Sequence, residues 1–245
     1  ISTSTAADDP YLSYSYSYPH KTAYRAFEAP RSLKNIWQGE NRQSLFLYLH
    51  VPFCEMRCGF CNLFTLANPS QPLEQGYLST LKLEAQVVAA ALGDAQFTRM
   101  AIGGGTPTFL AVNELHELFD LVETNFSIHP AKIPVSVETS PQTATKEKLL
   151  VLKARGVDRV SIGVQSFVEA EVQAVGRSQS SEIVCKALNE IKTIGFATLN
   201  VDLIYGLPGQ TEETWRGSLA SALQFQPEEV YIYPLYVRSL TGLAR

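Results

Sequence analysis

The sequence predicts an α/β fold built around a parallel β-sheet. From residue 44 onward, continuous apolar segments typical of buried strands alternate with segments of helical spacing. Strands of this kind joined by helical crossovers are typical of a parallel sheet that is covered on both faces. The chain has 245 residues, of which 45% are apolar, and this is enough for one large domain with a substantial core. The pattern is compatible with an open doubly wound sheet and with a barrel.

The first half of the core is expected to contain three strands and two helices. Residues 45–51 read LFLYLHV, the pattern of a buried strand, and residues 98–104 form a second strand that ends in glycines. A proline near the start of 133–139 marks the beginning of a third strand, because proline is tolerated at the first positions of a strand. The spacing of apolar residues predicts helices over 73–92 and 112–126.

The second half of the core continues this alternation. Residues 145–156 are predicted to form a helix that is terminated by the glycine at its end. Ser180 or Ser181 is expected to cap a helix over 180–196, and a threonine caps another over 211–225. The remaining strands are expected over 158–165, 198–206 and 229–237. The sequence therefore predicts six strands with helices between them.

Residues 1–40 are expected to form an N-terminal arm that is separate from a core over 41–245. The segment 11–25 is rich in tyrosine and serine and has little helical periodicity. Its many tyrosines argue against disorder, so we interpret it as an extended arm over the core. The alternating tyrosines are expected to pack against the core, and a substrate-facing surface is the alternative. Residues 1–9 are expected to form a disordered tail.

The charge and hydropathy of the chain exclude several classes of protein. The net charge is −4, the sequence pI is about 5.6, and no block of lysine and arginine occurs, so a nucleic-acid partner is not expected. No apolar run approaches the roughly 20 residues that a membrane span needs, and no secretory signal is recognisable. We therefore expect no membrane partner. The clustered cysteines indicate a thiolate metal site in a reducing cytoplasm, so we expect a cytoplasmic protein.

Three of the four cysteines are crowded into eight residues. Cys54, Cys58 and Cys61 follow the first strand directly, while Cys185 lies in a helical segment. Cysteine thiolates are the soft ligands that iron–sulfur clusters require. Three thiolates on one loop leave the fourth iron of a cubane cluster without a protein ligand, free to bind a small molecule. A structural zinc site completed by His50 is the alternative.

The residues around the cysteines resemble a known family. The segment Leu47–Phe64 reads LYLHVPFCEMRCGFCNLF, with a C-x3-C-x2-C loop and an aromatic residue, Phe60, before the last cysteine. The glycine-rich segment GGGTPT at 103–108 follows the second strand. Both features are similar to those of the radical SAM (S-adenosylmethionine) superfamily. The longer string YLHVPFC resembles the branch of oxygen-independent coproporphyrinogen III oxidase, which also includes haem chaperones and radical methyltransferases.

The resemblance covers nearly the whole chain and implies a fold and two cofactors. The fold would be a (β/α)6 partial TIM barrel of the radical SAM type, with 41–245 as the radical SAM catalytic core. The cofactors would be a [4Fe–4S] cluster held by Cys54, Cys58 and Cys61, and SAM. A C-terminal substrate domain, which the family carries after the partial barrel, is expected to be absent from this chain.

The resemblance also implies which residues contact SAM. Most of them stand near the ends of predicted strands, where parallel α/β folds place their sites. Arg177 suits the SAM carboxylate as a bidentate donor, Glu138 suits the ammonium group, and Gln165 and Asp202 suit ribose hydroxyls. The full set implied by the resemblance is Tyr48, Phe60, Gly104, Gly105, Thr106, Glu138, Gln165, Arg177, Asp202 and Tyr236.

Tyr48 and His50 are expected to act together with the three cysteines in catalysis. The two residues share one face of the first strand, because residues two apart in a strand point the same way. The resemblance implies that Tyr48 contacts SAM, and we expect His50 near the cluster on the substrate side. A hydrogen-bonded core histidine is the alternative for His50.

The function implied by the resemblance is that of a radical SAM oxidoreductase, similar to oxygen-independent coproporphyrinogen III oxidase. It would cleave SAM to a 5′-deoxyadenosyl radical and act on a tetrapyrrole or related small molecule, with flavodoxin or ferredoxin as electron donor. A methyltransferase of the same branch and a non-enzymatic haem chaperone are the alternatives. Two positions depart from the oxidases: Leu63 stands where they usually carry a fourth cysteine, and Gln179 where they tend to carry histidine.

Overall fold

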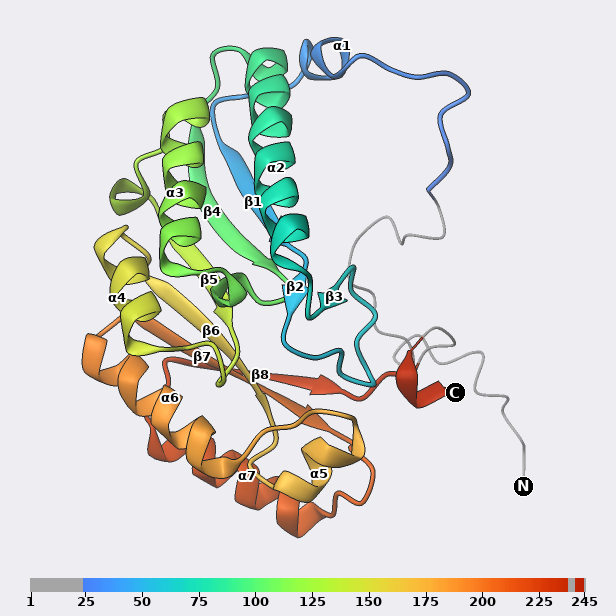
Figure 1. Cartoon of the computed structure of the whole chain (residues 1–245), viewed down its shortest axis with the longest axis vertical. Helices are drawn as coiled ribbons and strands as arrows, with labels where there is room; N and C mark the ends of the chain where they lie inside the picture. Colours follow the sequence, from blue (N-terminus) through green and yellow to red (C-terminus); the bar gives the residue numbers. More distant parts are fainter. Residues whose placement is uncertain (1–23, 238–240, 245) are drawn as a thin grey trace.

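The centre of the computed structural model, which describes residues 24–237 and 241–244, is a six-stranded parallel sheet (Figure 1). The strands follow one another in chain order and are β1 (Leu45–Val51), β4 (Phe97–Gly104), β5 (Val135–Thr139), β6 (Arg159–Gln165), β7 (Thr198–Tyr205) and β8 (Glu229–Pro234). Each strand pairs in parallel with the next, while β1 and β8 are the two open edges. The six predicted strands are confirmed, and their order is that of a partial barrel.

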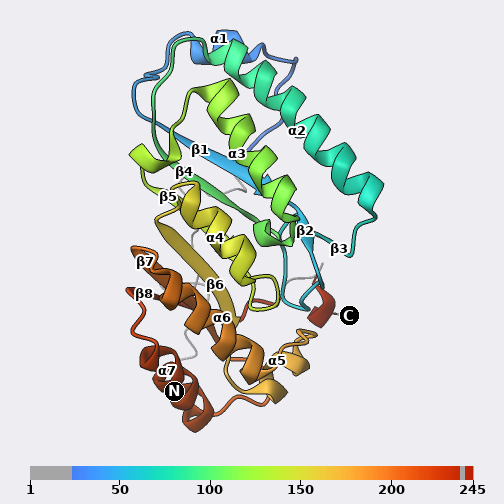
Figure 2. The ribbon, with the colours of Figure 1, turned by 60° about the vertical axis from the view of Figure 1, so that its left-hand side comes forward.

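The predicted helices are also confirmed, and they lie on one face of the sheet. They are α2 (Gln71–Leu92), α3 (Val112–Phe126), α4 (Lys146–Ala154), α6 (Ser181–Ile194) and α7 (Glu212–Gln224). Figures 1 and 2 show these helices as a single outer layer. The expectation of cover on both faces is wrong, because crossovers of one hand in a curling sheet keep every helix on the outside.

The expected helix caps are present where the structure describes them. Ser180 accepts a hydrogen bond from the backbone N–H of Ile183 at 3.3 Å, and Thr211 accepts one from Thr214 at 3.2 Å. Each cap satisfies a backbone donor in the first turn of its helix. Of the two candidate serines, Ser180 is the cap.

Several short elements had no signal in the sequence pattern. They are the helices α1 (Leu33–Trp37) and α5 (Glu169–Ala174), the paired strands β2 (Phe53–Cys54) and β3 (Leu66–Ala67), and the 3-10 turns η2 (Pro107–Phe109), η3 (Pro130–Lys132) and η4 (Gly242–Ala244). Elements of two to six residues are too short for a hydrophobic period to appear.

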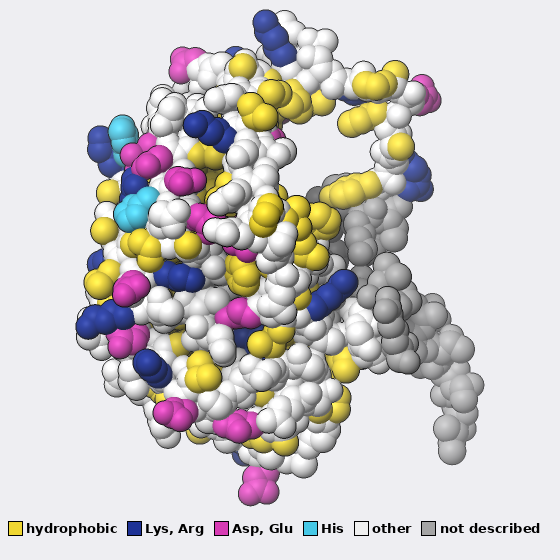
Figure 3. Space-filling view, in the orientation of Figure 1, with side chains coloured by type: hydrophobic (Ala, Val, Ile, Leu, Met, Phe, Trp, Pro, Cys, Tyr) yellow, Lys and Arg dark blue, Asp and Glu magenta, His cyan; other side chains and the backbone are white. Residues whose placement is uncertain are grey.

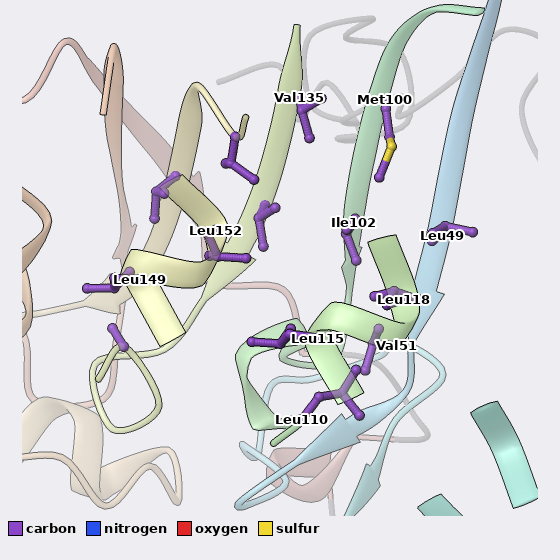
Figure 4. Close-up of a cluster of buried hydrophobic side chains, with 14 of the residues drawn as sticks. Leu49, Val51, Met100, Ile102, Leu110, Leu115, Leu118, Val135, Leu149 and Leu152 are labelled. Atoms are coloured by element: carbon purple, nitrogen blue, oxygen red, sulfur yellow. The ribbon is translucent and has the colours of Figure 1, made fainter. Parts of the chain in front are cut away.

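The hydrophobic core lies between the sheet and the outer helices (Figure 4). Leu115 and Leu118 of α3 and Leu149 and Leu152 of α4 are fully buried against strand residues such as Ile102. Burying a leucine side chain stabilises the fold by about 1.5–3 kcal/mol, so this layer fixes the strands on which the site depends.

At β1, the side chains on the inner face of the sheet are more exposed to solvent than those on the outer face. Leu49 and Val51 point toward the helices and are buried, whereas Phe46 and Tyr48 point inward and are 58% and 48% exposed. The concave side of the barrel is therefore accessible beside β1.

Much of the predicted N-terminal arm lies outside the described residues. These undescribed positions, 1–23, include the alternating tyrosines 14, 16 and 18. In the described part, residues 24–36 are exposed, α1 contacts α2, and Trp37 packs against the core. Among the helices that the structure describes, none combines the length and the apolar composition needed to cross a membrane.

Candidate functional site

A cavity of about 240 Å³ lies at the carboxyl ends of the strands, beside the cysteine-bearing loop. All three clustered cysteines line it, together with the glycine-rich turn after β4. The predicted residues that line it are Cys54, Cys58, Phe60, Cys61, Gly104, Gly105, Thr106, Glu138, Gln165, Arg177 and Asp202. Tyr48, His50 and Tyr236 are not among the lining residues. The structure thus brings together eleven predicted positions that are spread over 149 residues of sequence.

The loop between β1 and α2 holds the three cysteines in a defined arrangement. Its two ends pair as β2 and β3, and the Cys61 N–H donates to the Cys58 carbonyl at 3.0 Å. In the middle, the Gly59 N–H donates to the Val175 carbonyl at 2.7 Å, which ties the loop to the end of α5. All the cysteines in the described residues, including Cys185 on α6, are free thiols.

Each of the three thiols in the cavity has a different polar neighbour. Thr106 donates to Cys54 Sγ at 3.6 Å, and Arg177 donates to Cys58 Sγ at 3.4 Å. The hydroxyl of Thr65 lies 3.8 Å from Cys61 Sγ. Burial raises the pKa of the Cys54 thiol, and the hydrogen bond from Thr106 opposes this shift. Donors aimed at sulfur favour the thiolate form, which is the form that binds metal.

The glycine-rich turn lies against the cysteine loop without room for a side chain. A Cβ atom on Gly105 would lie 2.6 Å from the Phe53 carbonyl oxygen and 3.0 Å from Cys54 Sγ. The Gly105 N–H donates to the Val51 carbonyl, and the Thr106 N–H donates to the Phe53 carbonyl, both at 2.7 Å. This turn therefore sets the position of the first cysteine.

The donor set of the cavity is rich in sulfur, the ligand atom that iron–sulfur clusters require. Among the described residues, no three histidine, cysteine or carboxylate side chains converge as a single-ion site requires. Three thiols that line one cavity instead suit a ligand with a separate metal atom for each thiolate. The two ring nitrogens of His50 contact Tyr48 and the Phe64 carbonyl.

Tyr48 and His50 form a hydrogen-bonded pair on the inner face of β1. His50 Nε2 lies 2.8 Å from the Phe64 carbonyl, and because a carbonyl only accepts, Nε2 carries the proton. His50 Nδ1 is then the acceptor for the Tyr48 hydroxyl at 3.2 Å. Burial, with smaller effects of Glu138 and Tyr77, raises the pKa of Tyr48 to about 12. His50 thus fixes the loop after Cys61.

Two carboxylates that line the cavity stand near the carboxyl ends of β5 and β7. Glu138 of β5 accepts a hydrogen bond from the Gly104 N–H at 3.0 Å. Asp202 of β7 accepts from Asn200 at 2.8 Å and from Ser161 at 3.2 Å. Burial raises the pKa of Glu138, and it raises the pKa of Asp202 to about 6. Carboxylates in a cavity lining favour a cationic or hydrogen-bond-donating ligand.

Gln165 and Arg177 are held by unusual local geometry. Gln165 has a φ of +70°, in the left-handed region, where the pairing register of β6 and β7 shifts. A non-glycine residue in this region is strained, and such strain concentrates at functional sites. Arg177 donates to the Gly163 carbonyl at 2.5 Å and to Gln179 at 2.8 Å, in addition to Cys58. Its guanidinium therefore joins β6 to the cysteine loop.

Some residues of the site were not singled out from the sequence. Glu55 and Met56 occupy the gap between the first two cysteines and line the cavity, as does Ser140 after β5. The Ser178 N–H donates to Met56 Sδ at 3.2 Å. Glu55 and Met56 could have been predicted from the sequence, because they lie between the first two cysteines of the C-x3-C spacing. Ser161 also lines the cavity. The sequence signal for it is its spacing from Gln165 along β6, because residues two or four apart in a strand point to the same face.

The loop after Cys61 also exposes apolar side chains beside the cavity. Leu63, Phe64 and Leu66 are 54%, 81% and 44% exposed, and Leu63 lines the cavity. Figure 3 shows apolar side chains gathered over this loop and the adjoining start of α2. One margin of the cavity is thus an apolar surface.

Comparison with known proteins finds one matching family model and relatives of similar sequence. Residues 48–222 match the family model described as the radical SAM superfamily. The chain is 32% identical over 227 residues to oxygen-independent coproporphyrinogen III oxidase of Salmonella typhimurium, covering 90% of this chain and 49% of the relative. It is 34% identical over 194 residues to the heme chaperone HemW of Bacillus subtilis, covering 79% of this chain and 51% of the relative.

The fold comparison agrees with the sequence comparison. The structure of coproporphyrinogen III oxidase from Escherichia coli, described as a radical SAM enzyme, superposes with a TM-score of 0.79 at 30% identity, over 86% of this chain and 48% of that one. A radical SAM methyltransferase from Kitasatospora setae superposes with a TM-score of 0.60 at 16% identity, which shows the fold alone. The chain spans about half the length of the curated relatives it matches.

Proposed function

Because the chain belongs to the radical SAM superfamily, we propose that Cys54, Cys58 and Cys61 hold a [4Fe–4S] cluster and that the adjoining cavity binds SAM. The observation that carries this proposal is the lining of one cavity by three free thiols on a single loop. When bound and reduced, the cluster supplies the electron that cleaves SAM to methionine and a 5′-deoxyadenosyl radical.

The cavity residues of this chain would bind and orient SAM. Arg177 carries the positive charge that a carboxylate needs, and Glu138 is a carboxylate in the cavity lining that suits an ammonium group. Gln165 and Asp202 offer hydrogen-bonding groups suited to ribose hydroxyls. Gly104 and Gly105 allow the backbone of this turn to lie close to its neighbours, because a Cβ would meet the His50 ring at Gly104 and Cys54 Sγ at Gly105.

Aromatic residues would complete this SAM site. Phe60 lines the cavity beside Cys61. Tyr48 and Tyr236 lie outside the lining, so a contact with SAM requires the ligand to extend from the cavity toward them. Their roles, and that of His50 on the substrate side, are part of the proposal.

The reaction that we propose is that of an oxidoreductase similar to coproporphyrinogen III oxidase, acting on a tetrapyrrole or related small molecule. Identity of 32% over 90% of this chain to such an oxidase supports this reaction. The exposed Leu63 and Phe64 beside the cavity support a substrate with a large apolar surface, as a tetrapyrrole has. An electron donor such as flavodoxin or ferredoxin, and a cytoplasmic location that keeps the thiols reduced, belong to the same proposal.

A haem chaperone is the second candidate function. Its support is the 34% identity to the heme chaperone HemW and the leucine at position 63, where the oxidases usually carry a fourth cysteine. A chaperone of this kind would bind haem in stoichiometric amount and would show no substrate-dependent cleavage of SAM.

Anaerobic reconstitution with iron and sulfide, followed by reduction and addition of SAM, tests the proposal. We expect 5′-deoxyadenosine from the wild type and from Cys185→Ser, since Cys185 lies on α6 and outside the cavity. We expect none from Cys54→Ala. Stimulation by coproporphyrinogen III would support the oxidase, whereas haem binding with no deoxyadenosine under any condition would favour the chaperone.

A further inference from the structure

Glu55 directly follows the first cysteine of the loop, and its carboxylate reaches across to another strand. Ser140 Oγ donates to this carboxylate and lies 3.2 Å from Oε2. Ser140 stands directly after β5, so this bond joins the cysteine loop to the sheet over 85 residues of sequence. Both residues line the cavity.

Behind Ser140 lies a continuous chain of buried hydroxyl groups. Ser140 Oγ lies 2.9 Å from Thr143 Oγ1, which lies 2.6 Å from Thr108 Oγ1, which in turn lies 2.6 Å from Thr139 Oγ1. These four residues are between 0% and 7% exposed. They come from the turn after β4, the end of β5 and the turn after β5, which are the elements that flank the cavity.

The carboxylate of Glu55 determines which hydroxyl group donates and which accepts in each of these hydrogen bonds. A hydroxyl has one proton to donate, and Ser140 donates its proton to a carboxylate that can only accept. Thr143 is then the donor to Ser140, Thr108 the donor to Thr143, and Thr139 the donor to Thr108. Hydrogen bonds aligned in this way polarise and strengthen one another in a buried setting. The row of hydrogen-bonded hydroxyl groups therefore ends at the Glu55 carboxylate, inside the cysteine loop.

We propose that Glu55 is a positioning residue for the iron–sulfur cluster, with two effects that can be separated. Its hydrogen bond from Ser140 anchors the cysteine loop to the buried hydroxyl chain. Its negative charge beside the thiolates opposes the addition of an electron, so it lowers the reduction potential of the cluster. The inference rests on the proposed function, because it concerns the cluster that the three cysteines would hold.

Three substitutions separate these two effects. Glu55→Gln removes the charge but keeps a side-chain oxygen that accepts from Ser140. Ser140→Ala keeps the charge but removes the donor. Glu117→Gln is the matched control, because Glu117 is exposed on α3 and does not line the cavity.

The reconstituted proteins are compared by redox titration, followed by electron paramagnetic resonance, and by the half-life of the cluster in the presence of a chelator. We expect Glu55→Gln to shift the midpoint potential to a more positive value and to shorten the half-life less than Ser140→Ala does, because a neutral hydrogen bond to Ser140 remains. Glu117→Gln is expected to change neither quantity. We expect Ser140→Ala to shorten the half-life by about tenfold, the effect of losing one hydrogen bond to a charged group.

A midpoint potential in Glu55→Gln equal to that of the wild type would overturn the proposal. So would a half-life in Ser140→Ala equal to that of the wild type. Both results differ from failure of the proposed function, in which the wild type itself forms no cluster or forms one that never cleaves SAM.

Discussion

Arg177 donates a hydrogen bond from Nη1 to the sulfur of Cys58, at 3.4 Å. The same guanidinium donates to the Gly163 carbonyl on β6 and to Gln179. One side chain thus connects the cysteine loop, the sheet and the segment that leads into α6. Lysine has a single charged nitrogen and cannot reproduce this planar arrangement.

Arg177→Lys is therefore expected to weaken SAM binding by about tenfold or more, since bidentate recognition of a carboxylate is lost. Anaerobic equilibrium dialysis of the reconstituted protein measures this affinity. The matched control is Arg216→Lys, because Arg216 is an exposed residue of α7 that forms only a surface ion pair with Glu212. Equal SAM affinity in Arg177→Lys and the wild type would show that Arg177 does not bind the SAM carboxylate in a bidentate manner.

Gly105→Ala is expected to destabilise the protein by about 1–3 kcal/mol and to lower its iron content after reconstitution. The reason is steric, because the new Cβ would lie 2.6 Å from the Phe53 carbonyl and 3.0 Å from Cys54 Sγ. Urea denaturation and iron analysis measure the two effects.

The control for this substitution is Gly217→Ala. Gly217 lies within α7, and nothing stands within 4 Å of a Cβ at this position. Alanine there is expected to stabilise the protein by about 0.5–1 kcal/mol, because it forms helices better than glycine. A loss of iron in Gly217→Ala as large as in Gly105→Ala would refute the steric account.

Asp202 makes the stability of the cofactor-free protein depend on pH. Burial raises its pKa from 3.8 to about 6, so the folded state holds a proton between these values that the unfolded state has released. The contribution of Asp202 is thus fully present below about pH 4 and is lost as the pH rises through 6. Asp202→Asn removes this dependence and is expected to be more stable at pH 7, by at most about 3 kcal/mol.

Urea denaturation at several pH values between 4 and 8 measures this difference. Asp94→Asn, at an exposed position after α2, is the control and should follow the wild type at every pH. Parallel curves for Asp202→Asn and the wild type would show that Asp202 does not titrate in this range.

The left-handed backbone at Gln165 is expected to lower the stability of the fold, while it places the side chain in the cavity lining. Its φ of +70° costs a residue with a side chain about 1–2 kcal/mol relative to glycine. Gln165→Gly should therefore be more stable than Gln165→Ala by about 1 kcal/mol, while both lose affinity for SAM. Thermal denaturation compares the two variants directly, and equal stability would mean that the backbone at this position is not strained.

The strands could be predicted because the apolar pattern is strong where the sheet is buried, whereas their order in a partial barrel was implied by the family resemblance. Val135 and Val137 of β5, for example, are fully buried, and the pattern follows from that burial. The layer arrangement could not be predicted in the same way. Whether helices cover one face or two depends on the curl of the sheet, which the apolar pattern does not encode.

The cavity residues could be predicted where a motif marks them, as at Cys54, Gly105 and Asp202. Glu55 and Ser140 could not, because their role arises from a contact over 85 residues of sequence. His50 shows the same limit. Its position on the strand was predicted, but its bond to the Phe64 carbonyl depends on how the loop folds back.

The central claim is that three thiols hold a cluster with one iron open to SAM. Electron paramagnetic resonance of the reduced, reconstituted protein, recorded before and after the addition of SAM, tests it most directly. The account predicts a cluster signal that SAM shifts in the wild type and in Cys185→Ser, and no such signal in Cys58→Ala. A signal that SAM leaves unchanged, or one that persists in Cys58→Ala, would contradict the account.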